Sequence, residues 1–379
     1  MRFAFCLFNY FPYGGLQRDF LRIAQACQRR GHSVEVFTIK WLGPVPDGLK
    51  VTVVAVRGLS NHLRYTRFVK AVRKLLHQQH FDVVVGFNKM PGLDVYYAAD
   101  TCYAARVDEQ QRSWFYKMLP RYRALRALEQ EVFTAGKNTE VLLIAHQERD
   151  KFMHYYGTDA TRFHLLPPGI DKQRLTRNVP EPADRTRLRS ALDVRSEDYM
   201  LLNVGSRFRT KGIDRALITL ASLPPELRAR SRLVVVGDDV ARPFLRLARR
   251  LGVDERVTFT GAREDVAAFY YAADLLIHPA HTENTGTTLI EAMVCGLPVL
   301  ATANCGFAFH VENAGAGRIC PLPFEQEKLN LMLAEMLDRE RLAKWQRHGP
   351  EYCAKTDLYN LIERAADVIV ERAASNRST

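Results

Sequence analysis

Short apolar runs alternate with longer helical patterns along the chain, and the alternation occurs twice. In the first half, RFAFCLF, VEVFTI and VVVGF are separated by helical patterns over residues 16–30 and 63–79. In the second half, MLLNVG, RLVVVG and DLLIHP alternate with helical patterns over 213–222, 242–251 and 287–294. Strands that alternate with helices build a parallel sheet covered on both faces. The chain is therefore predicted to form two doubly wound, Rossmann-like α/β domains.

The stretch LLPPGIDKQRLTRNVPEPADR separates the two halves, and its prolines and charges predict neither strand nor helix. A chain of 379 residues exceeds the usual size of one domain. We therefore expect domains over 1–168 and 169–357, with a terminal helix at about 358–374 that crosses back onto the first. The carboxyl ends of both sheets are expected to face a cleft between the domains, where ligands bind open α/β folds.

Composition narrows the class of protein. Seven scattered cysteines without a C-x-x-C pair favour reduced thiols in a cytosol over a zinc site. No apolar run reaches the roughly 20 residues that span a bilayer, and the apolar N-terminus is interpreted as a first strand. The net charge of +12 belongs mainly to the first half, so a basic partner surface is expected there.

Two glutamates, Glu283 and Glu291, stand eight positions apart around a Thr-Gly-Thr turn. The turn precedes the apolar run LIEAMV, so a helix is expected to begin near Gly286 or Thr287, where free N–H groups bind phosphate. Glu291 is placed to hold the two hydroxyls of a ribose, and Glu283 those of a second sugar. The pattern fits a nucleotide-sugar, and its candidate ligands are Glu283, Asn284, Thr285, Gly286, Thr287 and Glu291. The alternative is a capped amphipathic helix with an incidental acid.

The loop after the first strand runs from Tyr10 through Tyr13 to the glycine pair Gly14 and Gly15, and a helix follows. Paired glycines let a backbone approach a ligand closely at a helix start. The alternative is a turn that requires positive φ. The G-x-G-x-x-G pattern of dinucleotide-binding proteins is absent, which disfavours a dehydrogenase.

The loop GSRFRTKG carries Arg207, Arg209 and Lys211 close to a helix start. Thr210 and Gly212 flank the lysine where a P-loop has Gly and Ser or Thr, so a Walker NTPase is disfavoured. A lysine and an arginine can neutralise a diphosphate in place of a metal, and the chain has no D-x-D motif. We expect metal-independent chemistry and no cofactor, against the alternative of a solvated basic loop.

Two aspartates are candidates for orienting or deprotonating an acceptor hydroxyl. Asp100 ends the segment GFNKMPGLDVYYAAD, and Asp19 lies on the first helix behind the glycine pair. For Asp19 the alternative is an ordinary acid in the first helical turn, which the helix dipole favours.

The segment RSWFYKMLPRYRALR, residues 112–126, combines basic and aromatic residues and contains no acid. Such a mixture suits an anionic membrane surface. It would also suit RNA, but no RNA-binding motif accompanies it, and no nucleic-acid partner is expected. A docked helix with a solvated basic face is the alternative. The residues predicted at the membrane surface are Arg112, Trp114, Lys117, Arg121, Arg123 and Arg126.

Together, the E-x7-E glutamates, the glycine pair, the basic loop and the hinge resemble retaining glycosyltransferases of the GT-B fold, family 4. The segments FPYGGLQRDF, GFNKMPGLDVYYAAD, FHLLPPGI, ADLLIHPAHTENTG and CGFAFH are similar, more narrowly, to the lipopolysaccharide core glucosyltransferase I branch. The resemblance covers essentially the whole chain. It implies transfer of glucose from UDP-glucose to an inner-core heptose of lipopolysaccharide, on the cytoplasmic face of the inner membrane. It also implies that the domain over 1–168 binds the acceptor and the domain over 169–357 binds the nucleotide-sugar.

The same resemblance implies roles for individual residues. Glu291 holds the ribose and Glu283 the glucose hydroxyls, while Asp100 stands where many relatives carry a histidine. The diphosphate lies against Gly15, Lys211 and Arg207 or Arg209; Arg174 reaches the donor, and the backbone near Arg263 faces uracil. No carboxylate is placed as a covalent nucleophile, so a front-face displacement is expected. The open alternatives are another hexosyl- or heptosyltransferase of this fold and a non-catalytic, membrane-recruited nucleotide-binding protein.

Overall fold

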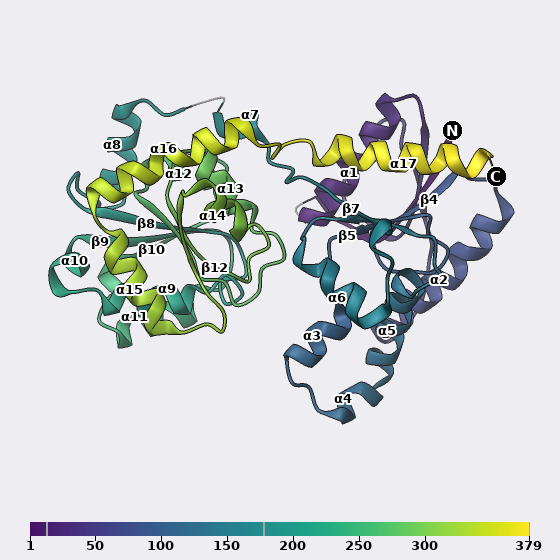
Figure 1. Ribbon diagram of the computed structural model, residues 1–379, viewed down its shortest axis with the longest axis horizontal. Helices are drawn as coiled ribbons and strands as arrows, with labels where there is room; N and C mark the ends of the chain where they lie inside the picture. The colour runs from purple at the N-terminus through teal and green to yellow at the C-terminus, as the bar shows by residue number, and fades with distance from the viewer. Residues whose placement is uncertain (13, 177–178, 379) are drawn as a thin grey trace. The chain divides into compact units, whose positions relative to one another are not determined.

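The computed structural model describes residues 1–12, 14–176 and 179–378 and divides into two compact units (Figure 1). Unit 1 comprises Met1–Gly169 and Asn360–Thr379, and unit 2 comprises Ile170–Tyr359. Each unit has a parallel sheet with helices around it, so the predicted class of two doubly wound α/β domains is confirmed. No helix in the described ranges is long and apolar enough to cross a membrane.

The sheet of unit 1 has the order β3-β2-β1-β4-β5-β6-β7, and all of its pairings are parallel. Its central strands are apolar on both faces because helices cover both, which is the usual pattern of a parallel sheet. The strands are β1 (Arg2–Tyr10), β2 (Ser33–Trp41), β3 (Lys50–Val53), β4 (Val83–Gly86), β5 (Val95–Ala98), β6 (Glu140–Leu143) and β7 (Phe163–Leu165).

The last helix of the chain belongs to unit 1, where it packs alongside the first (Figure 1). Its small and branched apolar residues are buried in the core, and Arg30 forms ion pairs with Glu363 and Asp367 at 2.9 and 2.8 Å. The helices of unit 1 are α1 (Gly15–Arg29), α2 (Asn61–Gln78), α3 (Tyr103–Glu109), α4 (Trp114–Met118), α5 (Pro120–Phe133), α6 (Gln147–Tyr156), the 3-10 turn η1 (Ala160–Arg162) and α17 (Leu361–Ser378).

The sheet of unit 2 has the order β10-β9-β8-β11-β12-β13 and is also parallel. The strand order reverses between β8 and β11, which is where open α/β sheets bind ligands beyond their carboxyl ends. The strands are β8 (Tyr199–Val204), β9 (Ser231–Val236), β10 (Val257–Gly261), β11 (Leu275–His278), β12 (Val299–Thr302) and β13 (Gly317–Cys320).

Helices also form where the sequence predicted none. The proline-rich stretch between the units contains α7 and the first part of α8, so the prediction that it lacks helix is wrong. Proline is favoured at the first position of a helix, and Pro182 occupies that position in α8. The helices of unit 2 are α7 (Lys172–Thr176), α8 (Pro182–Ala191), α9 (Ile213–Ser222), α10 (Pro225–Ala229), α11 (Arg242–Arg250), the 3-10 turn η2 (Asp254–Arg256), α12 (Val266–Ala272), α13 (Thr287–Val294), α14 (Ala308–Ala314), α15 (Gln326–Met336) and α16 (Arg339–Lys355).

Candidate active site

In unit 2, the loops that follow β8 and β11 pack directly against each other. Gly212 has φ +75° at the start of α9, and a Cβ there would lie 1.9 Å from the carbonyl oxygen of Pro279. The position therefore requires glycine both for its left-handed backbone and for the contact. This close approach brings Lys211, from the first loop, into an ion pair with Glu283, from the second.

Glu283 is held from two sides by side chains of unit 2. Lys211 donates to its Oε2, and Nε2 of the fully buried His278 lies 3.3 Å from the same oxygen. Burial raises the pKa of the Glu283 carboxyl, but the hydrogen bond from His278 and the charge of Lys211 outweigh it and hold the pKa at about 2. Burial also lowers the pKa of His278, which favours a neutral ring that donates through Nε2. Glu283 is thus a fixed, ionised acceptor of hydrogen bonds.

Glu291 is anchored in a comparable way on α13. Its Oε1 accepts from Arg174 of α7 at 2.9 Å, and its Oε2 accepts from the hydroxyl of Tyr270 at 2.7 Å. Tyr270 is buried, and its pKa is raised by that burial and by the neighbouring carboxylate. The structure therefore joins Glu291 to Arg174, which the sequence had connected only through the family resemblance.

The turn between the two glutamates is shaped by contact with the loop after β12. Gly286 precedes α13 with a left-handed φ of +84°, which glycine adopts without strain, and α13 begins at Thr287, as the sequence predicted. The N–H of Phe307 donates to the carbonyl of Thr285 at 2.7 Å, and a Cβ on Gly306 would lie 2.0 Å from the carbonyl oxygen of Asn284. The CGFAFH segment thus packs against the turn and holds its backbone in place.

The basic side chains around this site differ in their partners. Arg207 is exposed and adopts φ +60°, and no ion pair of Arg207 is found in the part of the chain that the structure describes. Arg209 is exposed and lies 3.8 Å from Asp214. Arg263 pairs with Asp265 at 2.8 Å. Of the three, Arg207 has the guanidinium that is most open to an anionic ligand.

In unit 1, the glycine pair lies at the start of α1, and Tyr13 falls outside the described residues. Gly14 caps the helix with φ −86°, and neither glycine has a positive φ, so a turn that needs positive φ does not explain the pair. A Cβ on Gly14 would collide with the side chain of Gln17, whereas a Cβ on Gly15 would meet nothing within 4 Å. The assignment of both glycines to the donor stays a prediction.

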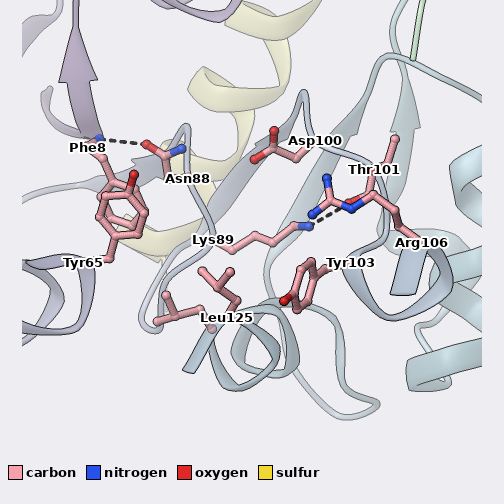
Figure 2. Close-up of a pocket in the computed structure, with 10 residues that line it drawn as sticks. Phe8, Tyr65, Asn88, Lys89, Asp100, Thr101, Tyr103, Arg106 and Leu125 are labelled. Atoms are coloured by element: carbon pink, nitrogen blue, oxygen red, sulfur yellow. Dashed lines mark hydrogen bonds between the residues drawn. The ribbon is translucent and has the colours of Figure 1, made fainter. Parts of the chain in front are cut away.

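The two candidate aspartates have different surroundings. Asp19 lies in the second turn of α1, so its interpretation as a first-turn acid is wrong, and it accepts from Tyr97 at 2.9 Å. Burial raises the pKa of Asp19, and the Tyr97 hydroxyl opposes the rise. Asp100 is exposed on the loop after β5 and lines a cavity within unit 1 (Figure 2). Asp100 is therefore the more accessible carboxylate of the two.

Comparisons with known proteins agree with this arrangement of two sheets and their loops. Residues 13–174 match the Glycosyltransferase Family 4 model, and residues 184–351 match the model of Glycosyl transferases group 1. The lipopolysaccharide glucosyltransferase WaaG of Escherichia coli (strain K12) is 43% identical over 368 residues, covering 97% of this chain and 98% of WaaG. This chain belongs to the lipopolysaccharide glucosyltransferase family.

Solved structures place the glycosyltransferase in the GT-B fold. The crystal structure of WaaG, a glycosyltransferase involved in lipopolysaccharide biosynthesis, superposes with a TM-score of 0.87 at 42% identity, covering 97% of this chain and 99% of WaaG. Anabaena Alr3699/HepE in complex with UDP-glucose superposes with a TM-score of 0.71 at 20% identity, covering 99% of this chain and all of HepE, which shows the shared fold. The predicted GT-B class and the predicted family are confirmed.

The aromatic and basic segment of the glycosyltransferase forms α4 and the first turns of α5. Trp114, Phe115 and Met118 are exposed by 63%, 62% and 62%, so the apolar side chains of α4 face solvent. Arg112, Arg121 and Arg123 are exposed as well. The segment is two helices that meet at Leu119 and Pro120, with an uncovered apolar and basic face.

Two basic residues of this segment have partners within unit 1. Arg126 is half-buried, because it donates to the hydroxyl of Tyr122 at 2.9 Å and lies over the ring of Tyr156. Lys117 is exposed but pairs with Asp108 at 2.6 Å. Arg126 is a packing residue of unit 1, and the charge of Lys117 is neutralised locally.

Sequence reasoning missed His278 and Tyr270, the neutral donors to the two glutamates. Both are buried, and neither stands in a motif that distinguishes it from a core residue. The one available signal was the position of His278 at the carboxyl end of β11, where parallel sheets place ligand-binding residues.

Proposed function

We propose that this glycosyltransferase transfers glucose from UDP-glucose to a heptose of the lipopolysaccharide inner core. The observation that carries the proposal is the paired anchoring of Glu283 and Glu291, each held by a cation and a neutral donor on either side of the start of α13. Two fixed carboxylates that flank a helix start suit two sugars joined through phosphate. The name of the Escherichia coli relative supports glucose and lipopolysaccharide as donor sugar and acceptor.

In this proposal, Glu291 holds the ribose hydroxyls and Glu283 holds hydroxyls of the glucose. The diphosphate lies against Lys211 and the first N–H groups of α13, with Arg207 as the open guanidinium beside them. Because Lys211 supplies a positive charge and the chain has no D-x-D motif, the diphosphate is bound without a metal ion. Arg174, which contacts Glu291, lies beside the ribose.

The proposed reaction retains the configuration of the anomeric carbon. The bond from that carbon to the phosphate oxygen breaks, and the acceptor oxygen forms its bond on the same face. The proton of the acceptor hydroxyl passes to an oxygen of the departing UDP. Glu283, with a pKa of about 2, is a weak base, which favours its role as a hydroxyl holder over proton transfer. Lys211 stabilises the negative charge that grows on the leaving group.

A donor panel tests the proposal. The enzyme is incubated in EDTA with lipopolysaccharide that ends at the inner core and, separately, with radiolabelled UDP-glucose, UDP-galactose, GDP-mannose and ADP-heptose. We expect label from UDP-glucose to enter the acceptor with the highest kcat/KM, and NMR of the product to show an α-linkage. Preferred transfer from another donor, a β-linked product or a requirement for added metal would each contradict the corresponding part of the proposal.

We further propose that α4 and the start of α5 attach the enzyme to the anionic, cytoplasmic face of the inner membrane. An exposed Trp-Phe pair beside exposed arginines matches the chemistry of interfacial helices, in which apolar side chains enter the headgroup region and cations meet anionic lipids. Arg126 has no part in this surface, because its side chain is held within unit 1.

Replacement of Arg121 and Arg123 by glutamine is expected to weaken binding to vesicles that contain anionic lipid by about tenfold or more, since each basic residue near the surface contributes about 1 kcal/mol. Sedimentation with liposomes, at two salt concentrations, measures the change, and added salt should reduce wild-type binding as well. Arg242→Gln/Arg246→Gln, which removes the same charge from α11, is the matched control. Equal binding of wild type and the Arg121/Arg123 variant would disprove an electrostatic role for this surface.

A further inference from the structure

A cavity of about 210 Å³ lies within unit 1, beyond the carboxyl ends of β4 and β5 (Figure 2). Pockets for drug-sized ligands begin at about 300 Å³, so this cavity suits a single sugar ring. Its wall is formed by loops that follow parallel strands, together with α2, α3 and α5. This is the edge of an open α/β sheet that binds ligands, and here it belongs to the unit without the E-x7-E glutamates.

Polar and aromatic groups in the cavity match a polyol. Oδ1 of Asn88 accepts from the N–H of Phe8 at 2.7 Å, which fixes the amide and leaves its Nδ2 group as a donor (Figure 2). Asp100 supplies an exposed carboxylate as an acceptor. Tyr65, stacked on Phe8 at 4.0 Å between ring centroids, adds an aromatic surface. Donor, acceptor and ring together are the groups that hydroxyls and the C–H face of a sugar require.

The wall of the cavity is held rigid by a buried ion pair. Nζ of Lys89 lies 2.5 Å from Glu129 and donates to the carbonyl of Thr101 at 3.0 Å. Glu129 also accepts from the N–H groups of Tyr103 and Ala104 at the start of α3. These contacts tie the loop after β4 to the loop that carries Asp100. They also neutralise Lys89, so its charge is not available to a ligand.

The unneutralised cation of the cavity is Arg106 on α3. Its side chain is exposed and lies over the ring of Tyr103 at 5.2 Å, and among the residues that the structure describes it has no acidic partner. Arg106 and Asp100 therefore offer one free positive and one free negative charge in the same cavity. A neutral sugar uses only the hydroxyl-binding groups, whereas Arg106 selects for an anion.

We propose that Arg106 is a specificity residue for the acceptor: with a sugar ring of the acceptor in this cavity, its guanidinium pairs with an anionic substituent, a carboxylate or a phosphate, on that ring or its neighbour. The proposal rests on the proposed function, because the acceptor there is a lipopolysaccharide core. It assigns Arg106 and Asn88 to acceptor recognition and leaves the donor to unit 2.

The test is direct binding of deacylated inner-core oligosaccharide, measured by calorimetry without donor, to wild type, Arg106→Gln and the control Arg149→Gln. Arg149 is an exposed arginine on α6 outside the cavity. Loss of a charged hydrogen bond corresponds to about tenfold or more in Kd, so Arg106→Gln should bind about tenfold more weakly while Arg149→Gln binds as wild type does. Thermal unfolding should be the same for all three proteins.

Two modified probes identify the anion. One oligosaccharide is dephosphorylated, and the other has its carboxylates reduced to alcohols. Wild type should lose about tenfold in affinity for one of them, and Arg106→Gln should lose nothing further for that probe. An unchanged Kd of Arg106→Gln for the untreated probe, or no wild-type binding, would overturn the inference. The proposed function fails separately, when the donor panel shows no transfer from UDP-glucose.

Discussion

Replacement of Lys211 by methionine is expected to lower kcat for glucose transfer by about 10²- to 10³-fold at saturating donor, the usual cost of removing a group that stabilises charge in the transition state. Methionine keeps most of the length of the side chain and removes its charge and its hydrogen-bond donors. Initial rates of transfer of radiolabelled glucose from UDP-glucose, the proposed donor, to the core acceptor measure the effect. Lys344→Met, an exposed lysine on α16, is the control and should keep wild-type activity.

Lys211 also neutralises a buried carboxylate, so its structural and chemical roles must be separated. In Lys211→Met, Glu283 loses its cation and keeps only His278. The double variant Lys211→Met/Glu283→Gln removes that unpaired charge. If Lys211 acts on the leaving group, the double variant should stay at least as slow as Lys211→Met. Recovery of wild-type rate in the double variant would show that the lysine serves only to neutralise Glu283.

The low pKa of Glu283 determines how this carboxyl contributes to stability at different pH values. The carboxyl has a folded pKa of about 2, below its ordinary value of 4.5, so its contribution to stability is present above pH 4.5 and is lost as the pH falls toward 2. Glu283 is consequently ionised throughout the neutral range. A titration of kcat above pH 5 therefore reports other groups.

The second large effect is on stability: Glu129→Ala is expected to lower the free energy of unfolding of unit 1 by about 3–5 kcal/mol. The substitution leaves Lys89, which is only 11% exposed, without its partner, and it removes the acceptor of two N–H groups and the Tyr156 hydroxyl. Urea unfolding of the full chain, followed by tryptophan fluorescence and circular dichroism, measures the change. The two units can unfold in separate steps, so the transitions are fitted individually.

Glu131 provides a matched control on the same helix. It pairs with Lys137 at 3.0 Å, but both side chains are about half exposed, and exposed pairs contribute only about 0–1 kcal/mol. Glu131→Ala should therefore change stability little. A variant with both Lys89→Met and Glu129→Leu should be more stable than Glu129→Ala, because it leaves no unpaired buried charge. Equal stability of Glu129→Ala and Glu131→Ala would refute the importance of the buried pair.

The fold of this protein was largely predictable from its sequence because its signals are local. Parallel strands buried on both faces are continuous apolar runs, and the helices between them repeat with their own period, so β1, β8 and α13 were expected close to where they lie. The start of α13 was predictable for a similar reason, since a polar turn that contains Gly286 is followed directly by the apolar run LIEAMV. The prediction for the proline-rich connection was wrong, because a proline that breaks the interior of a helix is favoured at its first position, and Pro182 occupies that position in α8.

The sequence by itself determined the two-domain α/β class, the position of the E-x7-E turn and the identity of the charged residues in each loop. Only the tertiary structure decided which charges meet. Lys211 and Glu283 are 72 residues apart, Arg174 and Glu291 are 117 apart, and Lys89 and Glu129 are 40 apart. Hydrophobic periodicity reports which face of an element is buried, but these polar pairs form only where the fold brings together helices or loops that are distant in the sequence. For that reason Arg126, predicted at the surface, turned out to pack inward, and His278 and Tyr270 emerged as partners of the glutamates.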